Sequence, residues 1–241
     1  MVLYLIGLGL GNEKDITLKG LEAVRKCEKV YLEKYTSRIV EHKKEELEKV
    51  YEKKIQEVDR SFVEGKVNEI VEEAKKKDVA LLIGGSPFAA TTHIEFLICG
   101  KKRKVQVKVI ENASVITAIG ITGLFIYKFG RITTIPRENK NVTSPFEVIQ
   151  KNQQMGLHTL LLLDVDEKSF MTAEEGVQYL IRQGLDPSSR VVGCAALGSD
   201  DPEIKVAEAK RIKLNKVPQC LIIPARELHF KEQEGLEMYK E

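Results

Sequence analysis

Residues 2–11 read VLYLIGLGLG, an unbroken apolar run that ends in three glycines at alternate positions, Gly7, Gly9 and Gly11. A continuous run of this kind is typical of a strand that is buried on both faces of a parallel sheet. Glycines at the carboxyl end of such a strand let the chain turn sharply and let a ligand approach the main chain. This stretch therefore predicts an α/β fold with a small-molecule site after the first strand.

The alternation of strands and helices continues to about residue 135. Strand patterns that follow the first one occupy residues 29–36, 79–83, 105–114 and 131–135. Helical patterns occupy residues 15–29, 39–55, 62–78 and 115–124. Either Asp15 or Thr17 could cap the first helix. Alternating elements of this type predict a mostly parallel sheet.

Pro136 marks a change to a second set of elements. Helical patterns follow at residues 144–156 and 172–184, and strand patterns at 158–166, 190–198 and 219–225, each followed by polar or helical sequence. We therefore expect two α/β domains with mostly parallel or mixed sheets. Their predicted bounds are residues 1–135 and 136–241.

The composition narrows the classes of partner. Lys and Arg number 38 against 36 Asp and Glu, so the formal charge of +2 predicts neither a nucleic-acid nor a membrane partner. The sequence shows neither a basic, apolar leader pattern nor a long apolar run, and we expect a cytoplasmic protein. Four cysteines lie far apart without metal-ligand spacing, which predicts reduced core residues and no metal site.

The first glycine turn has two further interpretations. It resembles the dinucleotide fingerprint G-x-G-x-x-G, but its third glycine comes one place early, and the charged stretch NEKD (12–15) follows where a pyrophosphate would bind. Glu33, after the second strand pattern, could then bind a ribose. A structural turn without any ligand is the other possibility.

A second glycine turn, GGSPFAATTH at residues 84–93, follows another strand pattern. Gly84, Gly85 and Pro87 predict an abrupt turn at the carboxyl edge of the sheet, where open α/β folds bind ligands. His93 could accept a proton there or serve only to hold the turn. A plain strand-to-helix connection is the alternative for this segment.

Four segments together resemble the diphthine synthases, a family within the tetrapyrrole methylase superfamily. They are YLIGLGLGNEKDIT (4–17), GSPFAATTH (85–93), NASVITAIGITGLFIYKFG (112–130) and GLHTLLLLDV (156–165). The resemblance implies S-adenosylmethionine as cofactor and methylation of the amine of a modified histidine on translation elongation factor 2, a step of diphthamide biosynthesis. It also implies a homodimer of two-domain chains with the cofactor in the interdomain cleft.

The resemblance carries eight cofactor-binding residues onto this chain. They are Leu10, Ser86, Ala89, Ser114, Val115, Leu163, Leu197 and Gln219. Several are apolar because such contacts run through main-chain N–H and C=O groups. The resemblance names no catalytic side chain.

Two positions depart from the family pattern. Ser86 stands where the family motif has an aspartate, so an acidic group near the cofactor is missing, and Ser86→Asp is expected to tighten binding. Gln219 replaces a histidine of a relative and keeps hydrogen-bonding capacity without titrating.

Two alternatives to this function stay open. The substrate could be a tetrapyrrole or another small metabolite, or the chain could be a module that has lost its cofactor. The basic tract KKRK (101–104) could steer an acidic partner or be a solvated helix end.

Overall fold

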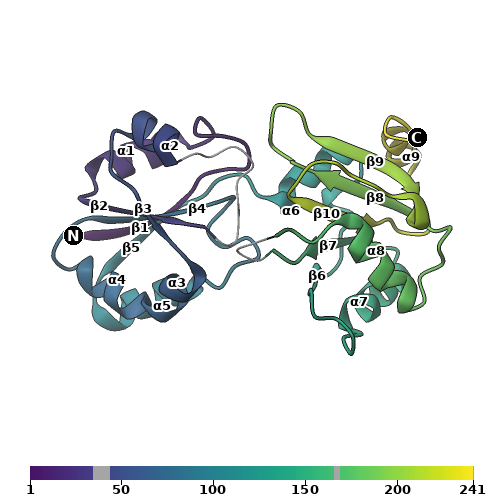
Figure 1. Cartoon of the computed structure of the whole chain (residues 1–241), viewed down its shortest axis with the longest axis horizontal. Coiled ribbons are helices and arrows are strands. Elements are labelled where there is room, and N and C mark those ends of the chain that lie inside the picture. The colour runs from purple at the N-terminus through teal and green to yellow at the C-terminus, as the bar shows by residue number, and fades with distance from the viewer. Residues whose placement is uncertain (35–43, 166–168, 241) are drawn as a thin grey trace. The chain divides into compact units, whose positions relative to one another are not determined.

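The structure, a computed structural model, describes residues 1–34, 44–165 and 169–240. The chain forms two compact units, Met1–Val115 and Ile116–Glu241 (Figure 1). Each unit has its own five-stranded sheet and its own helices. The prediction of an α/β fold with mostly parallel or mixed sheets is confirmed, since one sheet is parallel and the other is mixed.

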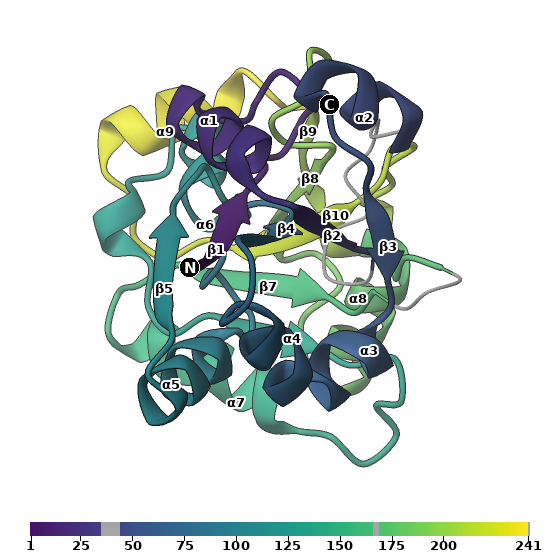
Figure 2. The ribbon, with the colours of Figure 1, turned by 90° about the vertical axis from the view of Figure 1, so that its left-hand side faces the viewer.

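The first unit is built on a wholly parallel sheet. Figure 2 shows its strands side by side, and their order is β3 (Gln56–Val58), β2 (Lys29–Glu33), β4 (Val79–Ile83), β1 (Val2–Gly7) and β5 (Gln106–Ile110). β1 therefore lies between β4 and β5, with Leu5 opposite both Leu81 and Val109. Because all these strands run the same way, their carboxyl ends meet at one edge of the sheet.

Helices cover both faces of the first sheet (Figure 1). One face carries α1 (Leu18–Lys26) and α2 (Lys44–Tyr51), and the other carries α3 (Arg60–Gly65), α4 (Val67–Glu73) and α5 (Ile94–Arg103). Burial on both faces explains why β1 and β4 are apolar along their whole length. Thr17 caps α1, since its side chain accepts a hydrogen bond from the Gly20 amide at 3.0 Å.

The second unit is built on a mixed sheet. Its strands, in order, are β6 (Thr133–Ile135), β7 (Thr159–Leu163), β10 (Gln219–Ile223), β8 (Arg190–Ala195) and β9 (Glu203–Glu208). β6 and β7 are parallel, and the other neighbours are antiparallel. Its helices are α6 (Val115–Ala118, which starts at the end of the first unit), α7 (Ser144–Gln154), α8 (Ala173–Arg182), α9 (Phe230–Glu237) and three 3₁₀ helices, Ile119–Thr122, Ile126–Lys128 and Ala209–Arg211. Side chains of α7 and α8 pack into one apolar core with the sheet.

Several elements differ from the sequence predictions. The helix expected at 62–78 is two helices, α3 and α4, and the helix expected at 115–124 is α6 followed by a 3₁₀ helix. Strands β3 and β9 were not predicted, because β3 has three residues and β9 is only partly buried at an edge. Residues 35–36, 39–43 and 166 of predicted elements lie outside the described residues.

The two compact units divide earlier in the chain than the boundary expected at residues 135 and 136. Strand β6 precedes that boundary, yet it pairs with β7 of the second unit, Thr133 lying opposite Leu161. The division into functional domains stays a prediction. The four cysteines are buried and free, as expected. In the described part of the chain, every helix is too short or too polar to span a bilayer.

A buried carboxylate joins α9 to the rest of the second unit. Glu232 is fully buried and accepts four hydrogen bonds, from Lys128 Nζ at 2.6 Å, His158 Nε2 at 2.9 Å, and the Phe125 and His229 amides at 3.0 and 2.9 Å. Burial alone would raise the pKa of Glu232, but the hydrogen bonds led by Lys128 outweigh it and lower the pKa to about 2.

His158 is neutral in this arrangement. Its Nδ1 accepts a hydrogen bond from the Ala225 amide at 2.9 Å, so the proton is on Nε2, which donates to Glu232. Burial lowers the pKa of His158, although Glu232 acts in the opposite direction. Both ring nitrogens are therefore occupied within the fold.

We predict that Glu232→Gln lowers the free energy of unfolding at pH 7 by about 3 kcal/mol, because it leaves Lys128 without its buried counter-charge. A carboxyl with a lowered folded pKa stabilises above the unfolded pKa of about 4.3, and the contribution is lost as the pH falls toward 2. Chemical denaturation from pH 2 to 7 should show the wild type and variant converging in acid. A difference that does not change with pH would contradict this.

Candidate functional site

Three turns meet at the carboxyl edge of the first sheet, after β1, β4 and β5. Gly9 and Gly85 join the first two turns by reciprocal main-chain hydrogen bonds, Gly9 N to Gly85 O at 3.2 Å and Gly85 N to Gly9 O at 2.8 Å. The glycine turns predicted from the sequence are thus bonded to each other. This is the edge at which open α/β sheets bind ligands.

The glycines are required by the closeness of these turns. Gly9 has φ +82°, and a Cβ on it would lie 2.7 Å from Cβ of Asp15. A Cβ on Gly7 would lie 2.6 Å from the carbonyl oxygen of Gly85. Gly85 also has positive φ (+69°), but a Cβ there would meet only ordinary contacts, such as Leu10 at 3.7 Å. Gly7 is therefore packed against the backbone of the second turn, and Gly9 against the side chain of Asp15.

Asn112 ties the third turn to the first. Its Nδ2 donates to the carbonyl oxygens of Gly7 and Asp15, both at 3.0 Å, and its Oδ1 accepts from the Ala113 amide at 2.8 Å. No role for Asn112 was predicted from the sequence. Its only signal was its place in the segment NAS, at the end of the strand pattern 105–114.

Five of the eight predicted cofactor-binding residues lie on these turns: Leu10, Ser86, Ala89, Ser114 and Val115. The Ala89 amide donates to the carbonyl oxygen of Ser86 at 3.1 Å, which closes the second turn. Ser114 is buried and engaged in the fold. The structure thus brings these five positions together, and their role in binding stays a prediction.

The other three predicted residues, Leu163, Leu197 and Gln219, lie at one end of the second sheet. Leu163 ends β7, Gln219 begins β10 opposite Ala195, and Leu197 follows shortly after Ala195. The Gln219 side chain is already bonded, since Oε1 accepts from the Ala173 amide at 2.6 Å and Nε2 donates to the Lys216 carbonyl at 2.6 Å. Its amide supports the start of α8, which the sequence did not indicate.

A buried pair of side chains supports the second turn from below. His93 Nε2 lies 2.8 Å from Glu33 Oε2, and both side chains are almost completely buried. His93 Nδ1 lies 3.1 Å from the Pro87 carbonyl, which also accepts from the Thr91 hydroxyl at 2.6 Å. A carbonyl only accepts, so Nδ1 donates to the Pro87 oxygen, and Nε2 faces the Glu33 carboxylate.

This pair settles two of the open sequence interpretations. His93 has both ring nitrogens engaged and is 2% exposed, so it holds the turn and is not placed to accept a proton from a substrate. Glu33 is 2% exposed and faces His93, so it is not placed to bind a ribose. The dinucleotide-binding interpretation relied on Glu33 as its ribose-binding acid, so the structure does not support it.

We predict that His93→Leu lowers the free energy of unfolding by roughly 3–5 kcal/mol, because it removes the 2.8 Å contact that His93 makes with the buried Glu33 carboxylate. The double variant His93→Leu/Glu33→Leu should lose clearly less than the sum of the two single variants. Urea denaturation of all four proteins measures this coupling. Strict additivity would show that the two side chains do not form a pair.

The basic tract 101–104 closes α5. Arg103 bonds to Glu72 at 2.6 Å and to Asn68, and Lys104 takes the left-handed conformation that ends the helix, with φ +57°. The alternative of a helix end fits this tract, whose three lysines, Lys101, Lys102 and Lys104, are all exposed.

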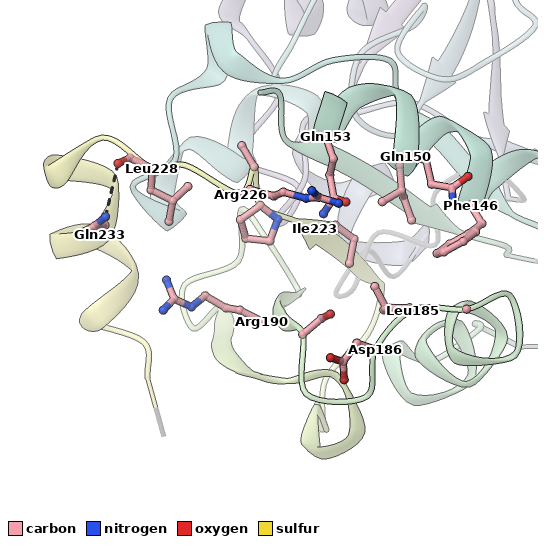
Figure 3. A pocket seen from close by; sticks show the side chains of 15 residues that line it. Phe146, Gln150, Gln153, Leu185, Asp186, Arg190, Ile223, Arg226, Leu228 and Gln233 are labelled. Carbon is pink, nitrogen blue, oxygen red and sulfur yellow. Dashed lines mark hydrogen bonds between the residues drawn. The ribbon is translucent and has the colours of Figure 1, made fainter. Parts of the chain in front are cut away.

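A separate cavity of about 640 Å³ lies in the second unit (Figure 3). Its lining comes from α7, the α8–β8 connection, the segment after β10, and α9. Arg190 and Arg226 line it, and Figure 3 shows their guanidinium groups pointing in different directions. None of the eight predicted residues lines this cavity. No sequence pattern predicted this cavity, because its lining residues come from distant segments.

Comparison with known proteins shows which protein family the chain is similar to. A profile of the "Tetrapyrrole (Corrin/Porphyrin) Methylases" matches residues 2–213. A diphthine synthase of Methanocaldococcus jannaschii is 39% identical over 98% of this chain and 97% of its own length. A probable diphthine methyl ester synthase of Arabidopsis thaliana is 39% identical over 99% of this chain and 98% of its own length.

Solved structures show the same likeness. A crystal structure of a diphthine synthase superposes with a TM-score of 0.93 at 35% identity, covering 100% of this chain and 96% of the other. A putative diphthine synthase from Entamoeba histolytica gives a TM-score of 0.90 at 35% identity, covering 100% of this chain and 98% of the other.

Proposed function

The chain belongs to the tetrapyrrole (corrin/porphyrin) methylase family and is a methyltransferase of the diphthine synthase type, and from this premise we propose its donor and its acceptor. The proposed donor is S-adenosylmethionine. The proposed acceptor is the amine of the 3-amino-3-carboxypropyl group on the modified histidine of translation elongation factor 2, which yields diphthine in diphthamide biosynthesis. Two relatives that align with nearly the whole chain are named diphthine synthase and probable diphthine methyl ester synthase, and these names support this acceptor.

The observation that carries the proposal is the meeting of three turns at the carboxyl edge of the parallel sheet. Gly9 and Gly85 hold the first two turns together through their own N–H and C=O groups and carry no side chains there, so a nucleoside could approach the main chain of the neighbouring turn residues. We propose that the turn residues Leu10, Ser86, Ala89, Ser114 and Val115 contact the donor, together with Leu163, Leu197 and Gln219 of the second unit.

Methyl transfer asks little of the protein's side chains. S-adenosylmethionine, when bound, supplies a methyl carbon already activated by a sulfonium. The chain's task is to hold donor and acceptor in line, and well-oriented reactants can gain roughly 7–11 kcal/mol in this way. An α-amino group has a pKa of about 7.7–8.0, so part of it is neutral without a base. This agrees with His93 and His158 being engaged within the fold.

We also propose a homodimer that works in the cytoplasm. The homodimer is proposed because the resemblance to the diphthine synthases implies one. The cytoplasm is proposed because the acceptor is a translation factor.

We expect the purified protein to transfer label from methyl-labelled S-adenosylmethionine to an elongation factor 2 preparation that carries the unmethylated histidine substituent. The second candidate for the acceptor is a tetrapyrrole, because the matching family is one of tetrapyrrole methylases. Incubation with a tetrapyrrole and the same labelled donor tests this candidate. Label on the tetrapyrrole alone would replace the proposed acceptor. Absence of S-adenosylhomocysteine binding at millimolar concentration in calorimetry would overturn the proposed donor.

The main-chain character of the site gives a separate prediction. Leu10→Ala and Val115→Ala keep the backbone groups, so each should change S-adenosylhomocysteine affinity by only about threefold or less, in keeping with the loss of a few apolar contacts. Gly9→Ala places a Cβ against Asp15 and should weaken binding more than either. Isothermal titration calorimetry of the three variants compares them. Larger losses in the two alanine truncations would show that side chains dominate.

A further inference from the structure

The carboxylate of Glu111 lies at the same edge of the sheet and is held there by Ser86. The Ser86 hydroxyl donates a short hydrogen bond to Glu111 Oε2. Ser86 lies on the turn after β4, and Glu111 directly follows β5, so the bond spans the end of β1, which lies between these strands. The two residues therefore bracket the Gly9 turn.

Glu111 is free to bind a ligand. Its side chain is exposed, and within the described residues no lysine or arginine pairs with it. Its Oε1 has unused lone pairs, while Ser86 fixes the direction of the carboxylate. Its neighbour Asn112 is anchored to the first turn by two hydrogen bonds, so the backbone that carries Glu111 is anchored as well.

This arrangement changes the meaning of Ser86. The sequence alone suggested that the edge lacks an acidic group, because position 86 is a serine. The structure places an acid there from another strand, and the serine serves to orient it. Adding Asp at position 86 would put two carboxylates in contact, and like charges at such a distance repel.

We propose that Glu111 forms an acidic subsite that accepts hydrogen bonds from the donor nucleoside, and that Ser86 positions it. A carboxylate at the carboxyl edge of a parallel strand can accept from ribose hydroxyls or from an ammonium group. S-adenosylhomocysteine carries both groups, and adenosine carries the hydroxyls alone. This inference rests on the proposed donor.

Calorimetry with S-adenosylhomocysteine and adenosine tests the subsite. Glu111→Gln should weaken S-adenosylhomocysteine binding roughly tenfold or more, in line with the loss of a hydrogen bond to a charged group. An equal loss for adenosine assigns the contact to the ribose, and an unchanged adenosine affinity assigns it to the ammonium group. The matched control is Glu22→Gln, which removes an exposed carboxylate on α1 and should leave both affinities unchanged.

Exchange of the two residues tests the role of Ser86. Ser86→Asp should weaken binding of S-adenosylhomocysteine, whereas Ser86→Asp/Glu111→Ser should recover most of the affinity, because the hydroxyl and carboxylate only trade strands. Thermal unfolding of each variant checks that the fold is kept. Tighter binding by Ser86→Asp alone would overturn the positioning role.

The two proposals fail in different ways. If the wild type does not bind S-adenosylhomocysteine, the proposed donor is wrong. Suppose instead that the wild type binds S-adenosylhomocysteine and that Glu111→Gln binds both S-adenosylhomocysteine and adenosine as tightly as the wild type does. The proposed donor then stands, and the acidic subsite is wrong.

Discussion

The pair of main-chain hydrogen bonds between Gly9 and Gly85 is the constraint on which the site depends. It brings two turns from different strands so close that a Cβ on Gly7 would meet the Gly85 carbonyl, while Gly9 and Gly85 both adopt positive φ in these turns. Asn112 links the turn after the third strand to the first turn in a similar way, but its hydrogen bonds come from a side-chain amide and not from a backbone group. Turns linked in this way suit a reaction that requires alignment more than acid–base chemistry.

Two histidine–glutamate pairs show how both ring nitrogens of a buried histidine can be engaged within the fold. In the second unit, His158 Nδ1 accepts from an amide N–H, so the ring is neutral and Glu232 takes its counter-charge from Lys128. In the first unit, His93 Nδ1 donates to a carbonyl and Nε2 faces Glu33. Both pairs are structural, although histidine is the residue that a search for catalytic groups would select first.

The sequence was most informative where burial is complete. β1 and β4 are apolar on both faces, so their runs and the glycines that end them were visible without a structure. β9 was missed because an edge strand with partly exposed side chains carries a weak pattern. The contact of Ser86 with Glu111 could not be inferred, since it depends on β1 inserting between β4 and β5, which no local pattern specifies. The cavity of the second unit was hidden for the same reason.

The Glu232 carboxylate has a consequence for synthesis on the ribosome. Its donors on Phe125, Lys128 and His158 emerge well before Glu232, so they must stay hydrated until that late residue arrives. The residues of Met1–Val115, by contrast, find their sheet partners among themselves. Nascent chains would therefore complete the amino-terminal half while translation continues, and the carboxyl-terminal half only after α9 has left the exit tunnel.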